Sequence, residues 1–276
     1  ALKENIGNLS SNNNQSELYL TDVIQMLKDD GKKVGGFTIC DEEEMLGVNS
    51  RVQLAACEKI MRRRINKYHM ENGVTFLDDA STLIDSGVKI GRDTILGPSI
   101  HLVGETTIGE GCVIQGASRI VDSTIADGAV IDSSVVEKSV VGSGVTMGPY
   151  AHLRPNCVLE ENVHIGNFVE VKNSHIGKGT KAGHLAYIGD GDVGENVNIS
   201  CGVIFCNYNG KEKFRTTIGD NAFIGSNVNL VAPIAIGEGA FIAAGSTVSK
   251  NVEDGSLAVE RSEQRMIPGW NRRKDS

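Results

Sequence analysis

The 276-residue sequence has few aromatic residues, few prolines and no excess of positive charge. Aromatic residues make up 5% of the chain, and there are 5 prolines against 33 glycines. Lysine and arginine number 27 against 35 aspartates and glutamates, which gives a net charge of −8. A general nucleic-acid binder usually presents a basic face, so this balance argues against one. A few placed cations would still suffice for a small anionic substrate.

Long apolar runs and paired cysteines are also missing. No window approaches the roughly 18 apolar residues of a membrane span, and no signal peptide is visible. The first residue is Ala1 rather than methionine, so we expect the natural chain to begin earlier. None of the 6 cysteines forms a C-x-x-C pair, and a chain of this length does not need disulfide staples. We expect them to be reduced and mostly buried, with zinc binding as the lesser alternative.

The sequence is instead rich in aliphatic residues that return at every sixth position. These positions are Ile84, Ile90, Leu96, Leu102, Ile108, Ile114 and Ile120; Val141, Met147, Leu153, Leu159, Ile165 and Val171; Ile176, Ala182 and Ile188 after a one-residue slip; and Ile218, Ile224, Leu230, Ile236, Ile242 and Val248. Six does not fit a helix with 3.6 residues per turn, and a fixed short period is typical of a stacked solenoid. Chance spacing does not produce seven and then six matches in a row.

This period predicts a mainly β fold, a parallel β-helix with a triangular section. Each hexad would be one short strand and one corner, with the aliphatic anchor pointing inward and stacking on those above and below. Glycine, asparagine and aspartate would fill the corners, where φ is often positive. The 33 glycines and 5 prolines suit many tight corners that keep their N–H groups for hydrogen bonds between coils. The aliphatic column needs few aromatic residues.

The first 50 residues do not follow the period. A helix is predicted to begin at Thr21-Asp22 and to end before Gly35-Gly36, followed by a short strand over residues 37–40. Asn49 or Ser50 then caps a longer helix that runs from Arg51 to about Met70 and ends at Gly73. The three consecutive arginines at 62–64 are best explained as a solvated helix face. The solenoid begins near Thr82.

The period loosens at residues 122–140 and is interrupted between Phe205 and Ile218. The second interruption contains the turn signal Asn209-Gly210, so we expect this loop to leave the wall. Insertions in solenoids usually lie on one face and often bind a ligand.

Several residues have the chemistry of a binding or catalytic site. His184 lies two positions past the inward Ala182, where it can face a groove and act as a base near neutral pH. Arg154 and Lys172 are three hexads apart, about one coil, so they should stack on one wall and together favour an anion such as phosphate. Glu170 points the same way as Lys172. The alternatives are an ordinary wall histidine and a surface salt bridge of little energy.

Asn198 is a polar residue in an aliphatic stretch, and Asn207 and Tyr208 open the protruding loop. Side-chain amides there can hold a substrate or steady an oxyanion. The alternative is that these asparagines cap corners, which is common.

Four ordered segments carry a resemblance to a known family. They are residues 148–155 (GPYAHLRP), 166–172 (GNFVEVK), 181–185 (KAGHL) and 206–210 (CNYNG). With residues 12–22 and 47–51, the match covers essentially the whole chain. The sequence resembles the bacterial bifunctional glucosamine-1-phosphate acetyltransferase and N-acetylglucosamine-1-phosphate uridyltransferase family.

The resemblance implies a left-handed β-helix, a cytoplasmic homotrimer and active sites between neighbouring chains. It divides the chain into a small α/β remnant of the uridyltransferase domain (1–49), a linker helix (50–73), the acetyltransferase domain (74–260) and a tail (261–276). The reaction would be acetyl transfer from acetyl-CoA to the 2-amino group of glucosamine 1-phosphate. The product would enter UDP-N-acetylglucosamine and cell-envelope synthesis, with neither nucleic acid nor membrane as a partner.

The resemblance also implies roles for single residues. His184 would be the general base, Arg154 and Lys172 would bind the sugar phosphate, and Glu170 would orient the amine or the histidine. The remaining assignments are Tyr187 and Asn198 for the sugar, and Cys201, Asn207, Tyr208, Ser226, Ala244 and Arg261 for acetyl-CoA. Cations of the tail would contact the CoA phosphates, and the alternative is that the tail is simply solvated. These cations are Arg265, Arg272, Arg273 and Lys274.

Two departures from the family pattern are visible. Cys201 stands where the family commonly has a small alanine near acetyl-CoA. The nucleotide-binding region of the uridyltransferase, with its glycine-rich loop, is absent from the sequence. Asn49 matches a metal ligand whose partner aspartate would lie in that region, so we expect an empty magnesium site and no uridyl transfer. Acetyl transfer itself would need no metal.

Three other readings remain. A different hexapeptide acyltransferase, such as a sugar O-acetyltransferase, is disfavoured by the segments at 181–185 and 207–210. A γ-type carbonic anhydrase needs three metal histidines across a trimer, and His164, His175 and His184 offer no close pair. A purely structural β-helix predicts that His184→Ala changes nothing except stability.

Overall fold

The computed structural model describes residues 2–12, 14–268 and 270. The chain divides into two compact units, residues 1–57 and 58–276. The first contains short helices, namely α1 (Leu2–Asn5), η1 (Ile6–Asn8), α2 (Asp22–Asp29) and η2 (Glu42–Met45). The predicted helix at Thr21-Asp22 is confirmed as α2.

The strand predicted over residues 37–40 is wrong. Phe37 is 91% exposed, and the described residues of the first unit contain no strand with which this segment could pair. Since an isolated strand leaves its backbone groups unpaired, the β-branched pattern alone does not produce one. The α/β character expected for residues 1–49 is therefore absent from the described residues, which form only helices and loops.

The long helix α3 (Arg51–Glu71) has both predicted ends. Ser50 Oγ accepts from the Gln53 N–H at 3.2 Å, and Gln53 Oε1 accepts from the Asn49 N–H at 2.7 Å. This exchange satisfies two amides that the first turn leaves unpaired. Gly73, with φ of 95°, ends the helix. Near that end, Asn66 is buried and donates to the Asp79 carbonyl at 2.9 Å, which fixes the helix to the first coil.

The chain is a left-handed parallel β-helix with three walls, as predicted. It begins at Thr75, before the start near Thr82 that the period indicates, because β1 already pairs with β4. Wall A contains, in order, β1 (Thr75–Phe76), β4 (Ile95–Leu96), β7 (Val113–Gln115), β10 (Val130–Asp132), β13 (Thr146–Met147), β16 (His164–Asn167), β19 (Lys181–His184), β22 (Asn198–Ile199), β25 (Phe223–Ile224), β28 (Phe241–Ile242) and β30 (Leu257–Ala258). Wall B contains β2 (Leu83–Ile84), β5 (His101–Val103), β8 (Arg119–Val121), β11 (Val135–Glu137), β14 (His152–Leu153), β17 (Glu170–Lys172), β20 (Tyr187–Gly189), β23 (Ile204–Cys206), β26 (Asn229–Val231) and β29 (Thr247–Val248).

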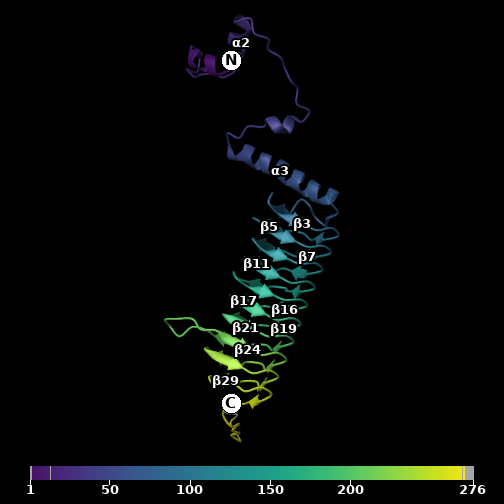
Figure 1. Ribbon diagram of the computed structural model, residues 1–276, viewed down its shortest axis with the longest axis vertical. Helices are drawn as coiled ribbons and strands as arrows, with labels where there is room; N and C mark the ends of the chain where they lie inside the picture. The colour runs from purple at the N-terminus through teal and green to yellow at the C-terminus, as the bar shows by residue number, and fades with distance from the viewer. Residues whose placement is uncertain (1, 13, 269, 271–276) are drawn as a thin grey trace, which may run out of the picture. The chain divides into compact units, whose positions relative to one another are not determined.

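Wall C completes each coil and runs through the stack in the same direction. Its strands are β3 (Lys89–Ile90), β6 (Thr107–Ile108), β9 (Thr124–Ile125), β12 (Val140–Val141), β15 (Val158–Leu159), β18 (His175–Ile176), β21 (Gly191–Val193), β24 (Thr216–Ile218) and β27 (Ile234–Ile236). Figure 1 shows the strands following one another along the stack. The loosened stretch at 122–140 keeps its strands, so the irregular spacing reflects a shorter corner and not a break.

The inward column is the one that the six-residue period predicts. All of the predicted anchors are buried except Ile90, which is half-buried near the first coils. The corner prediction is incomplete, because bulky residues also have positive φ there. Tyr150, Phe168 and Leu185 have φ of 62°, 56° and 42°. They are more than half exposed, and the rings of Tyr150 and Phe168 stack at 5.5 Å.

The cysteines are all free of disulfide bonds, as expected. The expectation that most are buried is wrong: Cys112 and Cys157 are buried, while Cys40 is exposed and the other three are half-buried. Among the described residues, no helix combines the length and apolar content needed to cross a bilayer.

Candidate active site

The outer face of wall B stacks the predicted phosphate-binding cations. His152 pairs with Glu170, and Leu153 with Val171, so the next position places Arg154 beside Lys172 on adjacent coils. The predicted stacking is therefore confirmed. One coil further, Glu170 pairs with Tyr187 and Lys172 with Gly189. The Tyr187 phenol and the Asn207 amide occupy the space beside Gly189, where a Cβ would clash with both, so only glycine fits at this position.

Arg154 and Lys172 differ in how their charges are met. Arg154 Nη1 lies 3.0 Å from Glu170 Oε1, and both side chains are about two-fifths exposed. An ion pair this exposed contributes little to stability. Among the described residues, Lys172 has no ion pair with a carboxylate.

The loop between β23 and β24, residues 207–215, leaves the stack as an arm and brings another cation to Lys172 (Figure 1). The ammonium groups of Lys213 and Lys172 are neighbours, and this contact lowers the pKa of Lys213; Asp190 acts in the opposite direction. Two adjacent ammonium groups repel unless an anion joins them. Lys213 is not among the predicted site residues; it lies in the interruption between Phe205 and Ile218, where the six-residue period gives no signal that its side chain lies near Lys172.

His184 lies at the end of β19, on the corner between walls A and B, and its side chain is exposed. The paired strands set the register of that corner: Ala182 with Ile199, Ile199 with Ile224, and Ile224 with Ile242. Two residues beyond these pairs, the same register aligns four predicted site residues in one column, which we call the corner column: His184, Cys201, Ser226 and Ala244. Arg261 Nη1 donates to the Ala244 carbonyl at 3.1 Å, at the far end of the column.

The other predicted site residues lie on both sides of this column. Asn198 is half-buried on wall A, and its amide donates to Ser200 Oγ at 2.9 Å. Asn207 is buried where the arm begins, and its Nδ2 lies 3.4 Å from the Tyr187 hydroxyl. Tyr208 is exposed on the arm and donates to the Gly210 carbonyl at 2.7 Å.

Some predicted residues lie away from this site or cannot be placed. Asn49 is exposed in the first unit, and its backbone N–H donates to Gln53 Oε1 at the start of α3. Across the described residues, no three histidine, cysteine, aspartate or glutamate side chains come together as metal ligands. Arg265 is exposed, whereas Arg272, Arg273 and Lys274 lie outside the described residues.

The comparisons with known proteins agree with this architecture. Residues 79–176 match the family model "GMPPB C-terminal domain", and residues 215–250 match "Bacterial transferase hexapeptide (six repeats)". The chain is 52% identical over 275 residues to the bifunctional protein GlmU of Clostridioides difficile (strain 630), and 51% identical over 273 residues to that of Alkaliphilus metalliredigens (strain QYMF). The chain is a homologue of the bifunctional GlmU proteins.

These matches cover 100% and 99% of the chain but 60% of each GlmU protein. Among solved structures, UDP-N-acetylglucosamine acyltransferase from Campylobacter jejuni is 22% identical, with a TM-score of 0.36, covering 65% of this chain and 70% of that one. With so low a sequence identity and TM-score, this likeness has no bearing on function.

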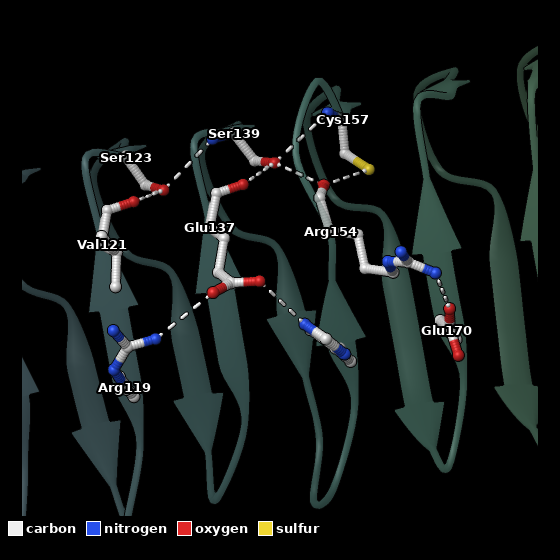
Figure 2. A network of polar contacts seen from close by, with 9 residues as sticks. Arg119, Val121, Ser123, Glu137, Ser139, Arg154, Cys157 and Glu170 are labelled. Carbon is white, nitrogen blue, oxygen red and sulfur yellow. Dashed lines mark hydrogen bonds and ion pairs between the residues drawn. The ribbon is translucent and has the colours of Figure 1, made fainter.

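In this GlmU homologue, the coils of wall B that precede the site carry charged side chains that are paired with opposite charges. Glu137 accepts from Arg119 Nη1 at 3.3 Å and contacts His152 Nε2 at 3.2 Å. Figure 2 shows the contact between Arg119 and Glu137. The hydrogen bond with His152, and then that with Arg119, hold the pKa of Glu137 below its usual value. Here each charge has an opposite partner within the wall.

Proposed function

We propose that this chain transfers the acetyl group of acetyl-CoA to the 2-amino group of glucosamine 1-phosphate. The observation that carries the proposal is the stacking of Arg154 and Lys172 on adjacent coils of wall B. Lys213 of the arm adds a third cation, close enough to Lys172 for the two charges to lower the pKa of Lys213. A phosphate monoester bound there would convert repulsion into charge-assisted hydrogen bonds. The relationship to GlmU proteins over the whole chain supports the substrate assignment.

His184 would act as the general base. As the amine nitrogen attacks the acetyl carbonyl carbon, a C–N bond forms and His184 takes the proton that the nitrogen loses. The tetrahedral intermediate then breaks its C–S bond, and the CoA thiolate leaves and is protonated. Glu170, on the neighbouring wall, would orient the amine or the histidine. An exposed imidazole can perform this step near neutral pH.

The substrates would lie on the two sides of the corner column. Tyr187 and Asn198 would hold the sugar, while Asn207 and Tyr208 would contact acetyl-CoA from the arm. The other acetyl-CoA contacts would be Cys201, Ser226, Ala244 and Arg261. A hydrogen-bond donor at this corner would stabilise the oxyanion. Acetyl transfer would require no metal, and magnesium would serve only uridyl transfer at the site of Asn49.

A homotrimer would complete each site. Large apolar side chains are exposed beside the corner column, at Tyr150, Phe168 and Leu185, and on wall A, where Phe223 and Phe241 stack at 4.5 Å. Exposed apolar groups of this kind favour burial against another chain. Sedimentation that shows only monomer would contradict the shared site. We also propose a cytoplasmic location, on the family relationship alone.

The proposal is tested by release of the CoA thiol from acetyl-CoA and glucosamine 1-phosphate. We expect the parent chain to be active and His184→Ala to lose about 10²- to 10⁴-fold in kcat. His175→Ala, an exposed histidine on wall C, is the matched control and should keep full activity. Equal activity of the parent chain and His184→Ala would remove His184 from the mechanism, and an inactive parent trimer would reject the substrate assignment.

A further inference from the structure

One corner of the β-helix carries a column of left-handed residues that ends at the arm. Asp122, Lys138, Asn156, Asn173 and Asp190 have positive φ there, and each N–H from Lys138 onward donates to the coil before it. By the register of β20 and β23, Asn207 takes the next place in this column. The chain then leaves as the arm, so Asp190 is the last member with that conformation.

Asp190 is buried between two asparagines. Only 6% of its surface is exposed, and the same is true of Asn207. Its Oδ1 accepts from Asn173 Nδ2, and its Oδ2 accepts from Asn207 Nδ2, both at 2.5 Å. A buried carboxylate is costly unless its oxygens are hydrogen-bonded, and here two amides from adjacent coils meet that need.

The carboxylate also decides which way the Asn207 amide faces. A carboxylate oxygen only accepts, so Asn207 must turn its Nδ2 toward Asp190. The same Nδ2 lies 3.4 Å from the Tyr187 hydroxyl. Both amide hydrogens therefore have partners inside the protein, and Asn207 can offer a ligand only its Oδ1 as an acceptor.

Asp190 further holds the far end of the arm through its backbone. The Thr216 N–H, where the chain rejoins wall C, donates to the Asp190 carbonyl at 3.1 Å. Arg215 Nε donates to Asp192 Oδ2 at 2.7 Å, and its Nη2 donates to the Gly191 carbonyl at 3.1 Å. Residues 190–192 thus contact both ends of the arm.

We propose that Asp190 is a positioning residue for the acetyl donor: its carboxylate fixes the Asn207 amide as an acceptor and holds the base of the arm. The inference rests on the proposed function, in which Asn207 contacts acetyl-CoA. Asp190 itself touches no substrate and acts through Asn207.

The test exchanges one acceptor for a donor. Asp190→Asn keeps the size and the tolerance for positive φ, but its single oxygen cannot serve two NH₂ groups, so Asn207 must flip or lose its partner. We expect the KM for acetyl-CoA to rise about tenfold, the effect of one hydrogen bond, with less than a twofold change in the KM for glucosamine 1-phosphate. Asp122→Asn makes the same change in the same column, away from the arm, and should leave both values unchanged.

A double variant separates positioning from stability. Asp190→Asn combined with Asn207→Asp restores a donor–acceptor order along the three residues and leaves a carboxylate oxygen as the outward acceptor. We expect the KM for acetyl-CoA to return to within about threefold of the parent chain. A double variant as impaired as the single one, or equal rises of both KM values in Asp190→Asn, would overturn the proposal.

Two readouts do not depend on turnover. Calorimetry should show about tenfold weaker acetyl-CoA binding by Asp190→Asn than by Asp122→Asn, even if glucosamine 1-phosphate proves to be the wrong acceptor. Amide hydrogen exchange at Phe214 and Thr216 should quicken in Asp190→Asn alone, since the Phe214 N–H donates to the Asn207 carbonyl at 2.8 Å. Unchanged exchange at both amides would show that the Asp190 carboxylate does not hold the arm.

Discussion

Two stretches of wall B share one register and one outer face but use their charges differently. The stretch of lower residue number, called the lower stretch, consists of Arg119, Glu137 and His152. It places the Glu137 carboxylate between the Arg119 guanidinium and the His152 imidazole. The stretch of higher residue number, called the upper stretch, pairs Arg154 with Glu170 and then leaves Lys172 beside Lys213. The difference teaches that neighbouring coils of one repeated scaffold can differ in their charges: in the lower stretch each charged group has an opposite partner, and in the upper stretch Lys172 has none among the described residues. The upper stretch is therefore the better candidate for an anion site.

Removing one arginine from each stretch is the strongest way to break this comparison. Arg154→Ala should lower kcat/KM for glucosamine 1-phosphate about 10- to 100-fold, since a charged hydrogen bond to a phosphate is lost. Arg119→Ala, in the lower stretch, should change it by less than about twofold. Steady-state CoA release for both variants checks this, and equal losses would erase the distinction between the stretches.

Removing the arm cation should have a smaller effect that depends on salt. Lys213→Gln should raise the KM for glucosamine 1-phosphate about threefold at low ionic strength and flatten its increase with added salt, because exposed charges are screened. Lys211→Gln, two residues earlier on the exposed arm, is the control. KM measured from low to high salt tests this, and parallel salt curves for the parent chain and Lys213→Gln would speak against a role for Lys213.

The smallest effect should come from the lower stretch and concern stability. The pKa of Glu137 is lower in the folded chain than its usual value of about 4.5, so its contribution is complete above that pH and is lost as pH falls through the folded pKa. Glu137→Gln should cost less than about 1 kcal/mol at neutral pH, and the gap should close in acid. Denaturant unfolding from pH 7 to pH 3 measures it, and a gap that widens in acid would contradict the assignment.

The sequence predicts the walls better than it predicts the site. A period of six is enough to place Leu153 inside and Arg154, the residue after β14, outside, and to stack Arg154 on Lys172, because each coil repeats the last. It does not reveal that Lys213 returns to Lys172, since that contact depends on how the arm folds.

Long-range partners explain the other misses. Asp190 looks like one more corner aspartate until its neighbours from the coils before and after are known. The strand expected at residues 37–40 fails for the same reason, because a strand depends on a partner that local pattern does not supply.

The central claim is that the upper stretch of wall B binds a phosphate. The most direct measurement is the ratio of kcat/KM for glucosamine 1-phosphate to that for glucosamine, in the parent chain and in Lys172→Ala. We predict a ratio of at least about 100 in the parent chain and a fall of about tenfold or more in Lys172→Ala, with the glucosamine value itself little changed. A ratio that is the same in both chains would show that Lys172 does not recognise the phosphate and would contradict the account.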